Sequence, residues 1–142
     1  MEFRSTADLA ATIAGNLNKV PRDVDLIVGI PRSGLLAANL LALDLNLPLT
    51  DLEGLLGGNI FQTGTTRMAK NWIKSVAQAR QIIVVDDSVH SGRAIAVAKR
   101  QVGAAKLRCG GPFAGIRLRR RIIGKLKSLA YRLDLIKQLR PQ

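Results

Sequence analysis

Two adjacent acidic residues follow the segment with the strongest β-propensity in the chain. Ile82–Val85 is a run of four β-branched residues, and Asp86 and Asp87 come directly after it. In open parallel sheets, ligands bind beyond the carboxyl ends of the strands. Carboxylates at that position can accept hydrogen bonds from hydroxyl groups or lie beside a hydrated Mg²⁺. The pair therefore predicts a binding site for hydroxyl groups or a magnesium complex, with a strand-end turn that caps the next helix as the alternative.

A short turn connects the acidic pair to an expected helix that starts at Arg93. This turn comprises Ser88, Val89, His90, Ser91 and Gly92. Such a turn can direct backbone N–H groups toward one point, and the helix N-terminus adds partial positive charge, so we expect it to hold a phosphate. Gly92 lets the backbone approach the anion because it has no Cβ. Acids beside a phosphate site suit a ligand that is both a sugar and a phosphate.

A second strand-turn-helix segment lies earlier in the chain. Val24–Ile30 is a short β-rich run without strict alternation, which is typical of a strand buried on both faces. Pro31–Gly34 interrupts this run, and the Leu- and Ala-rich Leu35–Asn46 is long enough for a helix packed on a sheet. This turn therefore has the same position between strand and helix as the turn after Asp87.

The segment Ile82–Ala94 resembles the signature of the type I phosphoribosyltransferases, in which four apolar residues precede two acids and a loop that ends in Thr/Ser-Gly. The resemblance implies that Asp86 and Asp87 contact the ribose hydroxyls of phosphoribosyl pyrophosphate (PRPP). It also implies that Ser88–Gly92 hold the 5′-phosphate. Ala94 departs from the family's pattern, which often has Thr or Ser at that position, so one hydroxyl for the phosphate would be missing.

The earlier turn resembles the pyrophosphate loop of the same family. This resemblance implies that the backbone amides of the turn, with Arg32, Ser33 and Gly34, bind the diphosphate. The glycine-rich Gly57–Thr66 lies where the family has its flexible catalytic loop, which implies catalytic roles for the residues after it, Arg67 and Lys70.

The resemblance implies a Mg²⁺-dependent phosphoribosyltransferase of nucleotide synthesis or salvage. It would transfer the ribose 5-phosphate of PRPP to a nitrogenous base and release pyrophosphate, with Asp86 and Asp87 holding Mg²⁺ partly through PRPP and water. No residue identifies the acceptor base. Members of the family are commonly homodimers. The alternative function is a non-catalytic PRPP-binding regulator with an RNA-binding basic tail.

The remaining segments complete an α/β pattern. The expected order of strands and helices predicts a parallel β-sheet flanked by helices. The resemblance implies that this sheet belongs to the Rossmann-like type I phosphoribosyltransferase fold, and we expect a basic C-terminal helix after it. The other expected elements are a helix at Thr6–Leu17, a strand at Leu47–Thr50, a loop at Gly54–Thr66, and helices at Met68–Ala79 and Arg93–Val102.

The positive charge is concentrated in the last third of the chain. Residues 1–98 contain nine Lys/Arg and nine Asp/Glu, whereas residues 99–142 contain thirteen Lys/Arg and one acid and carry the whole net charge of +12. We therefore expect an α/β core at residues 1–105 and a basic extension at 106–142, mainly one amphipathic helix. Its expected apolar seam consists of Ile122, Leu126, Leu129, Leu133 and Ile136.

Three interpretations of this extension remain open. It could be a helix that covers the sheet with a solvated basic face, or a segment that binds RNA or an anionic surface. The third interpretation is a truncation or a changed reading frame near residue 100, which would explain the abrupt change in composition.

The composition excludes several other classes of protein. The chain has 142 residues and a single cysteine, Cys109, which excludes an internal disulfide framework and fits a reducing compartment. The longest apolar stretch, Leu35–Leu49, is too short and too polar to span a bilayer, and the N-terminus has no apolar signal region. The sequence therefore predicts a cytoplasmic protein.

Overall fold

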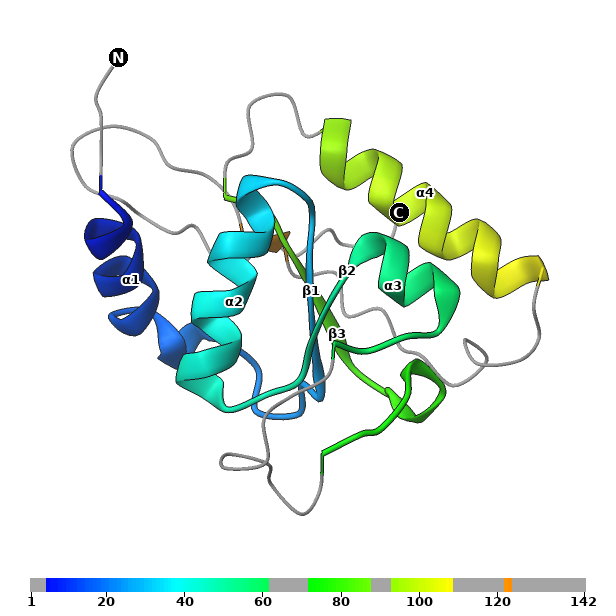
Figure 1. Cartoon of the computed structure of the whole chain (residues 1–142), viewed down its shortest axis with the longest axis horizontal. Coiled ribbons are helices and arrows are strands. Elements are labelled where there is room, and N and C mark those ends of the chain that lie inside the picture. The colour runs from blue at the N-terminus through cyan, green and yellow to red at the C-terminus, as the bar shows by residue number, and fades with distance from the viewer. Residues whose placement is uncertain (1–4, 62–71, 88–92, 109–121, 124–142) are drawn as a thin grey trace.

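The computed structural model describes residues 5–61, 72–87, 93–108 and 122–123, and shows a layered α/β arrangement (Figure 1). None of the helices in these ranges is long and apolar enough to cross a membrane. The elements are, in chain order, α1 (Thr6–Ala14), η1 (Leu17–Lys19), β1 (Leu26–Gly29), α2 (Ser33–Leu45), β2 (Leu49–Asp51), α3 (Leu52–Gly57), η3 (Val76–Gln78), β3 (Ile82–Val85), α4 (Arg93–Arg108) and β4 (Ile122–Ile123).

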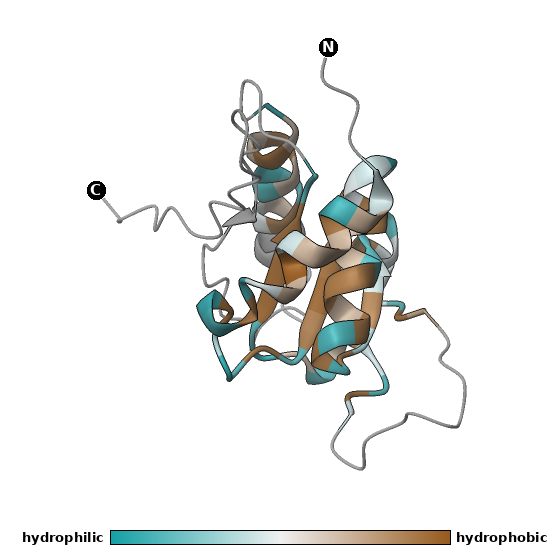
Figure 2. Ribbon diagram, turned by 90° about the vertical axis from the view of Figure 1, so that its left-hand side faces the viewer, coloured by the Kyte–Doolittle hydropathy of each residue, from teal (hydrophilic) through white to brown (hydrophobic). Residues whose placement is uncertain are grey.

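Helices cover both faces of the central sheet, which explains the continuous apolar strands. Ile27 of β1 packs with buried residues of α1 and α2, whereas its neighbours Leu26 and Val28 pack with residues of α3 and α4. Successive side chains of a strand point to opposite faces, so every residue of β1 is buried. Figure 2 shows these strongly hydrophobic strands between the helical layers.

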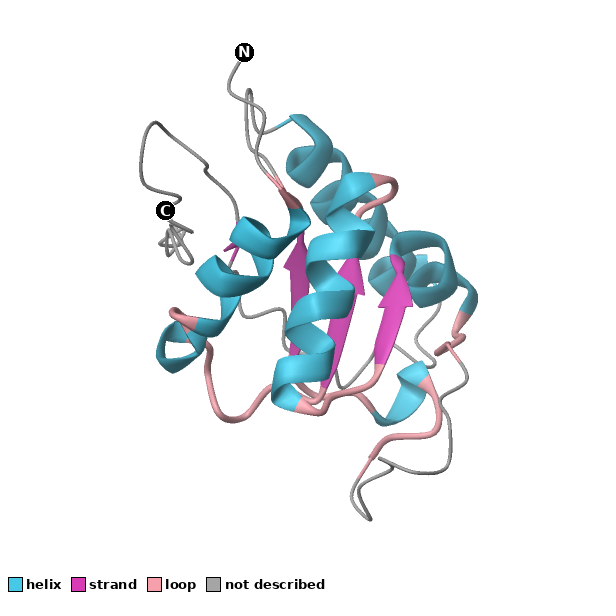
Figure 3. Ribbon diagram, turned by 60° about the vertical axis from the view of Figure 1, so that its left-hand side comes forward, coloured by secondary structure: helices cyan, strands magenta, loops and turns pink. Residues whose placement is uncertain are grey.

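The sheet is parallel, with the strand order β2-β1-β3-β4. Figure 3 shows the strands β1 to β3 side by side and pointing the same way. Val28 of β1 is in register with Thr50 of β2 and Val84 of β3. Parallel strands end at the same edge, so the segments after β1, β2 and β3 meet there. This confirms the predicted parallel sheet flanked by helices.

The observed bounds agree best with the predicted ones where the apolar pattern is strongest. The strand at Ile82–Val85 is confirmed, and β1 occupies the centre of the expected strand at 24–30. At the N-terminus, Ser5 and Asp8 form a capping box, but α1 ends at Ala14 and a short 3₁₀ helix follows. Helix α2 starts at Ser33, earlier than expected, so Ser33 and Gly34 belong to its first turn rather than to a preceding loop.

Three predicted elements differ from the structure. The expected loop at 54–66 is wrong in its first part, because α3 begins after Asp51, whose side chain caps it. This helix ends at Gly57, and its C-cap residue Gly58 has φ +81°. The described part of the helix expected at 68–79 contains only the 3₁₀ helix η3. Ile122, the first residue of the expected C-terminal seam, lies in β4 and not in a helix.

The remaining seam residues, from Leu126 onward, lie outside the described residues. Helix α4 continues to Arg108, beyond the helix expected at 93–102. The expected boundary between residues 105 and 106 therefore falls inside α4, and the change in charge begins on a helix that packs on the sheet.

Candidate functional site

The turn after β1 and the acidic pair after β3 are in contact at the carboxyl edge of the sheet. The backbone N–H of Ile30 donates a hydrogen bond to the carbonyl oxygen of Val85 at 2.9 Å. Beyond that bond, the hydroxyl of Ser33 donates to Oδ1 of Asp87 at 2.9 Å. Two motifs that are 54 residues apart in the sequence therefore share one hydrogen-bonded cluster.

Gly34 makes the close approach between these two segments sterically feasible. It is buried, and a Cβ at this position would lie 2.9 Å from both Cα and Oδ1 of Asp86 and 3.0 Å from the carbonyl oxygen of Val85. Gly29 has a similar role beneath the same turn, because a Cβ there would lie 2.8 Å from Cα of Leu35. The sequence assigned Gly34 to diphosphate binding, and the structure gives it a packing role beside the acids.

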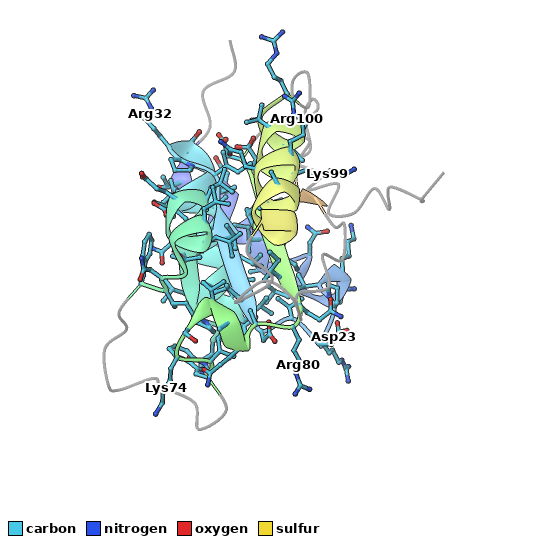
Figure 4. All side chains as sticks on the ribbon, turned by 90° about the vertical axis from the view of Figure 1, so that its right-hand side faces the viewer. Asp23, Arg32, Lys74, Arg80, Lys99 and Arg100 are labelled. Atoms are coloured by element: carbon cyan, nitrogen blue, oxygen red, sulfur yellow. The ribbon has the colours of Figure 1, made fainter. Side chains whose placement is uncertain are left out.

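Arg32 lies at the start of α2, at the same edge of the sheet. It occupies the N-cap position of α2 without a side-chain capping bond, and its peptide bond with Pro31 is cis. Its side chain is exposed and extends away from the end of the helix (Figure 4). The first turn of α2 has no acidic residue, so the helix N-terminus and the Arg32 guanidinium both favour an anion at this edge.

The carboxyl group of Asp86 has a strongly perturbed proton affinity. Burial first, and then the hydrogen bond and the negative charge of Asp87, raise the pKa of Asp86 from 3.8 to about 6, although a backbone hydrogen bond opposes this rise. That bond runs from the backbone N–H of Asp87 to Oδ1 of Asp86 at 3.0 Å. Two neighbouring carboxylates in this arrangement gain stability from a cation or from hydroxyl donors.

These two carboxylates suit a Mg²⁺ ion that is shared with a ligand better than a metal ion that is enclosed by protein side chains alone. Within the described ranges, no group of three or more His, Cys, Asp or Glu side chains could enclose a metal ion. Mg²⁺ usually keeps several waters and binds one or two carboxylates together with substrate phosphates. The oxygen donors of Asp86 and Asp87 therefore fit a Mg²⁺ ion that a phosphorylated ligand also coordinates.

A third aspartate at this edge was not singled out from the sequence. Asp51 ends β2, and its Oδ1 accepts a hydrogen bond from the backbone N–H of Gly54 at 2.6 Å. This bond caps α3. The pattern Asp51-Leu-Glu-Gly is a helix start that the sequence alone could have revealed.

The other predicted site residues lie outside the described residues. They are Ser88, Val89, His90, Ser91 and Gly92 of the expected phosphate loop, and Arg67 and Lys70 of the expected catalytic loop. The phosphate loop is nevertheless bracketed by well-defined elements, because β3 ends at Val85 and α4 begins at Arg93.

The segments that flank the expected catalytic loop attach to the opposite edge of the sheet. The backbone N–H of Phe61 donates to the carbonyl oxygen of Leu49 at 2.9 Å, and Nε1 of Trp72 donates to that of Asn46 at 2.8 Å. Asn46 is the C-cap of α2, and Leu49 begins β2. Both attachments are therefore at the amino edge, across the sheet from Asp86. The family resemblance did not lead us to expect this location.

Comparison with known proteins supports the fold. No family model and no curated protein matches the chain. Among solved structures, it is similar to the crystal structure of a purine phosphoribosyltransferase from Pyrococcus horikoshii Ot3, with a TM-score of 0.53 and 18% sequence identity. The match covers 87% of this chain and 74% of that chain. The protein thus shares its α/β fold with a phosphoribosyltransferase.

Proposed function

We propose that this protein is a Mg²⁺-dependent phosphoribosyltransferase that transfers the ribose 5-phosphate of PRPP to a nitrogenous base and releases pyrophosphate. The observation that carries the proposal is the contact between the two turns. Ser33 donates a hydrogen bond to Asp87, and Gly34 lies against Asp86. A ligand at this cluster would meet an anion-binding turn and two hydroxyl acceptors at once, as PRPP requires.

Each part of PRPP has a proposed partner at this edge. Asp86 and Asp87 would accept hydrogen bonds from the ribose hydroxyls, and the backbone of Ser88–Gly92 would hold the 5′-phosphate. The diphosphate would lie at the N-terminus of α2, where Arg32 and the Ser33–Gly34 amides favour negative charge. This order places the anomeric carbon between the acidic pair and the turn after β1.

Catalysis would depend on positioning and electrostatics. The acceptor nitrogen displaces pyrophosphate, so positive charge develops on the ribose ring and negative charge on the leaving group. The carboxylates of Asp86 and Asp87 would lie beside the ring and stabilise its positive charge. Arg32 would stabilise the leaving group. The attachment of Phe61 and Trp72 at the amino edge does not support a role of Arg67 and Lys70 in the same step. Magnesium, when bound, would offset part of the diphosphate charge.

Calorimetric titration with PRPP and Mg²⁺ tests this function. Asp86→Asn keeps the shape of the side chain but removes its charge, and we expect it to weaken PRPP binding by about 10- to 100-fold, the usual range for a lost hydrogen bond to a charged group. Asp51→Asn is the matched control at the same edge, because Asn is as good an N-cap as Asp. It should bind PRPP like the wild type.

A second assay measures pyrophosphate release with a panel of bases. The panel should start with purines, because the structural neighbour is a purine phosphoribosyltransferase. Release with one base, lost in Asp86→Asn and kept in Asp51→Asn, would support the enzyme. No PRPP binding by the wild type, or equal binding by the two variants, would contradict the proposal. Binding without release from any base would instead favour a non-catalytic PRPP sensor.

A further inference from the structure

Helix α4 has a positively charged outer side. Arg93, Lys99 and Arg100 are exposed on this helix, and its sequence, which also includes Lys106 and Arg108, has no acidic residue. Three of its apolar residues, Ile95, Ala98 and Val102, are buried in the core on the side that faces the sheet. The helix therefore presents charge to the solvent and keeps its apolar side on the sheet.

Lys99 and Arg100 form the clearest part of this surface. Both side chains are exposed and project from the outer side of α4 (Figure 4). Lys74 and Arg80 are also exposed but lie at the opposite end of the molecule in the same view. The molecule thus carries two pairs of exposed basic residues that are well separated in space.

The sequence from residue 99 onward carries a large excess of positive charge. Residues 99–142 contain thirteen Lys/Arg and one acid, whereas the chain before them sums to zero. Repulsion among so many like charges disfavours a compact state, and a polyanion would relieve it. The charge of α4 therefore indicates a polyanionic partner.

We propose that the outer side of α4, centred on Lys99 and Arg100, binds the phosphate backbone of a double-stranded nucleic acid. Arg and Lys neutralise phosphates without reading the sequence, which gives binding a strong salt dependence. Basic residues seven positions apart, such as Arg93 and Arg100, lie about 10 Å apart along a helix.

The composition of α4 favours a duplex over two other polyanions. Single strands are commonly bound by aromatic stacking, and α4 has no aromatic residue. A helix that lies on an anionic membrane inserts an apolar side, but the apolar residues Ile95, Ala98 and Val102 are buried against the sheet. The described outer side of α4 therefore offers basic residues without an aromatic ring for stacking or a large apolar side chain for insertion, which suits a duplex backbone.

The test measures binding of the full-length protein to a mixed-sequence duplex of about 24 base pairs by fluorescence anisotropy at several salt concentrations. We expect K99E/R100E to weaken binding at least about tenfold and to reduce the slope of log K against log salt by about 2. The control K74E/R80E changes the net charge equally at the distant end of the molecule. It should keep affinity within about twofold and leave the slope nearly unchanged.

Four outcomes would overturn the inference. Equal losses in the two variants would show that net charge alone attracts the duplex, and unchanged binding by K99E/R100E would exclude α4. Single strands that bind as tightly as the duplex, or anionic phospholipid vesicles that compete equally well, would assign the surface to another partner. Calorimetry of K99E/R100E with PRPP checks that the variant is folded and separates this inference from the proposed enzyme activity.

Discussion

Three aspartates follow parallel strands at one edge of the sheet, but they have two different roles. Asp51, after β2, bonds to Gly54 three residues later and starts its own helix. After β3, the backbone N–H of Asp87 donates to Asp86, the Asp87 carboxylate accepts from Ser33 of a different strand-helix unit, and Asp86 lies against Gly34 of that unit. The first carboxylate stabilises local structure, whereas the other two connect distant parts of the chain.

This difference shows how a site can be told from a helix cap. An acid after a strand is compatible with both roles, and Asp51 has the role that we considered as the alternative for Asp86 and Asp87. The distinguishing feature is the burial of Asp86 beside another acid, which raises its pKa to about 6. A helix cap stabilises the folded protein without a ligand, whereas two crowded carboxylates are stabilised when one of them is protonated or when a cation or a hydroxyl donor binds.

The largest expected effect comes from filling the space between the two turns. Gly34→Ala would place a methyl group 2.9 Å from the backbone of Asp86. We expect it to destabilise the protein by about 1–3 kcal/mol, as overpacking does, and to weaken PRPP binding because the turn must move. Chemical denaturation and calorimetry measure the two effects.

Gly103→Ala is the control for this substitution. Gly103 lies within α4, and among the described residues a Cβ there would meet no atom within 4 Å. Alanine at that position should stabilise the protein by about 0.5–1 kcal/mol, because glycine is a poor helix former. A Gly34→Ala protein as stable as the wild type would show that the two turns are not tightly packed.

The next effect separates the cap from the site. Asp51→Ala removes the cap of α3 and should lower the free energy of unfolding by about 1 kcal/mol, the usual cost of losing a helix N-cap. It should leave PRPP affinity unchanged in calorimetry at a temperature where the variant is folded. If Asp51→Ala lost PRPP binding as strongly as Asp86→Asn, Asp51 would belong to the binding site. The proposed difference between a capping Asp51 and a ligand-binding Asp86 would then be wrong.

A smaller effect is expected at Ser33. Ser33→Ala removes the hydroxyl that donates to Asp87 at 2.9 Å. Because Ser33 is exposed, we expect little change in the free energy of unfolding and a loss of PRPP affinity of about fivefold, which corresponds to about 1 kcal/mol. Ser33→Thr keeps a hydroxyl and should restore part of the affinity. Equal affinities for alanine and threonine would indicate that the hydrogen bond does not orient Asp87.

The last effect, which solvent screening reduces because Asp86 is only partly buried, is a pH dependence of stability. The pKa of Asp86 is about 6 in the folded protein and 3.8 ordinarily, so the folded state holds this proton more tightly. The contribution of Asp86 to stability is therefore greatest below about pH 4 and is lost as the pH rises toward 6. Thermal unfolding across this range should show that the wild type becomes less stable relative to Asp86→Asn as the pH rises.

The same titration should act on ligand binding in the opposite direction. The proposed ligand binds the ionised carboxylate, so PRPP affinity with Mg²⁺ should increase as the pH rises through about 6, and this increase should be weaker in Asp86→Asn. A difference in stability that does not change with pH would show that the acidic pair is not crowded in the folded protein.

Much of the fold could be predicted because its signals are local. Ile82–Val85 is a strand in both the prediction and the structure, since four consecutive β-branched residues favour extended backbone. The helix at Leu52–Gly57 was missed because its glycines suggested a loop, while Asp51 supplies a cap that outweighs them. The attachment of Phe61 and Trp72 at the amino edge was not predicted, because it depends on hydrogen bonds to distant carbonyl groups.

The sequence by itself determined the parallel α/β order, the acidic pair after β3 and the concentration of charge after residue 98, because each depends on residue types and their spacing. Only the tertiary structure decided which aspartate caps a helix and which one accepts the hydrogen bond from the Ser33 hydroxyl. The physical reason is that a polar group's role depends on the partner that satisfies it. For Asp51 that partner is three residues away, and for Asp87 it lies on another strand-helix unit that Gly34 allows to approach.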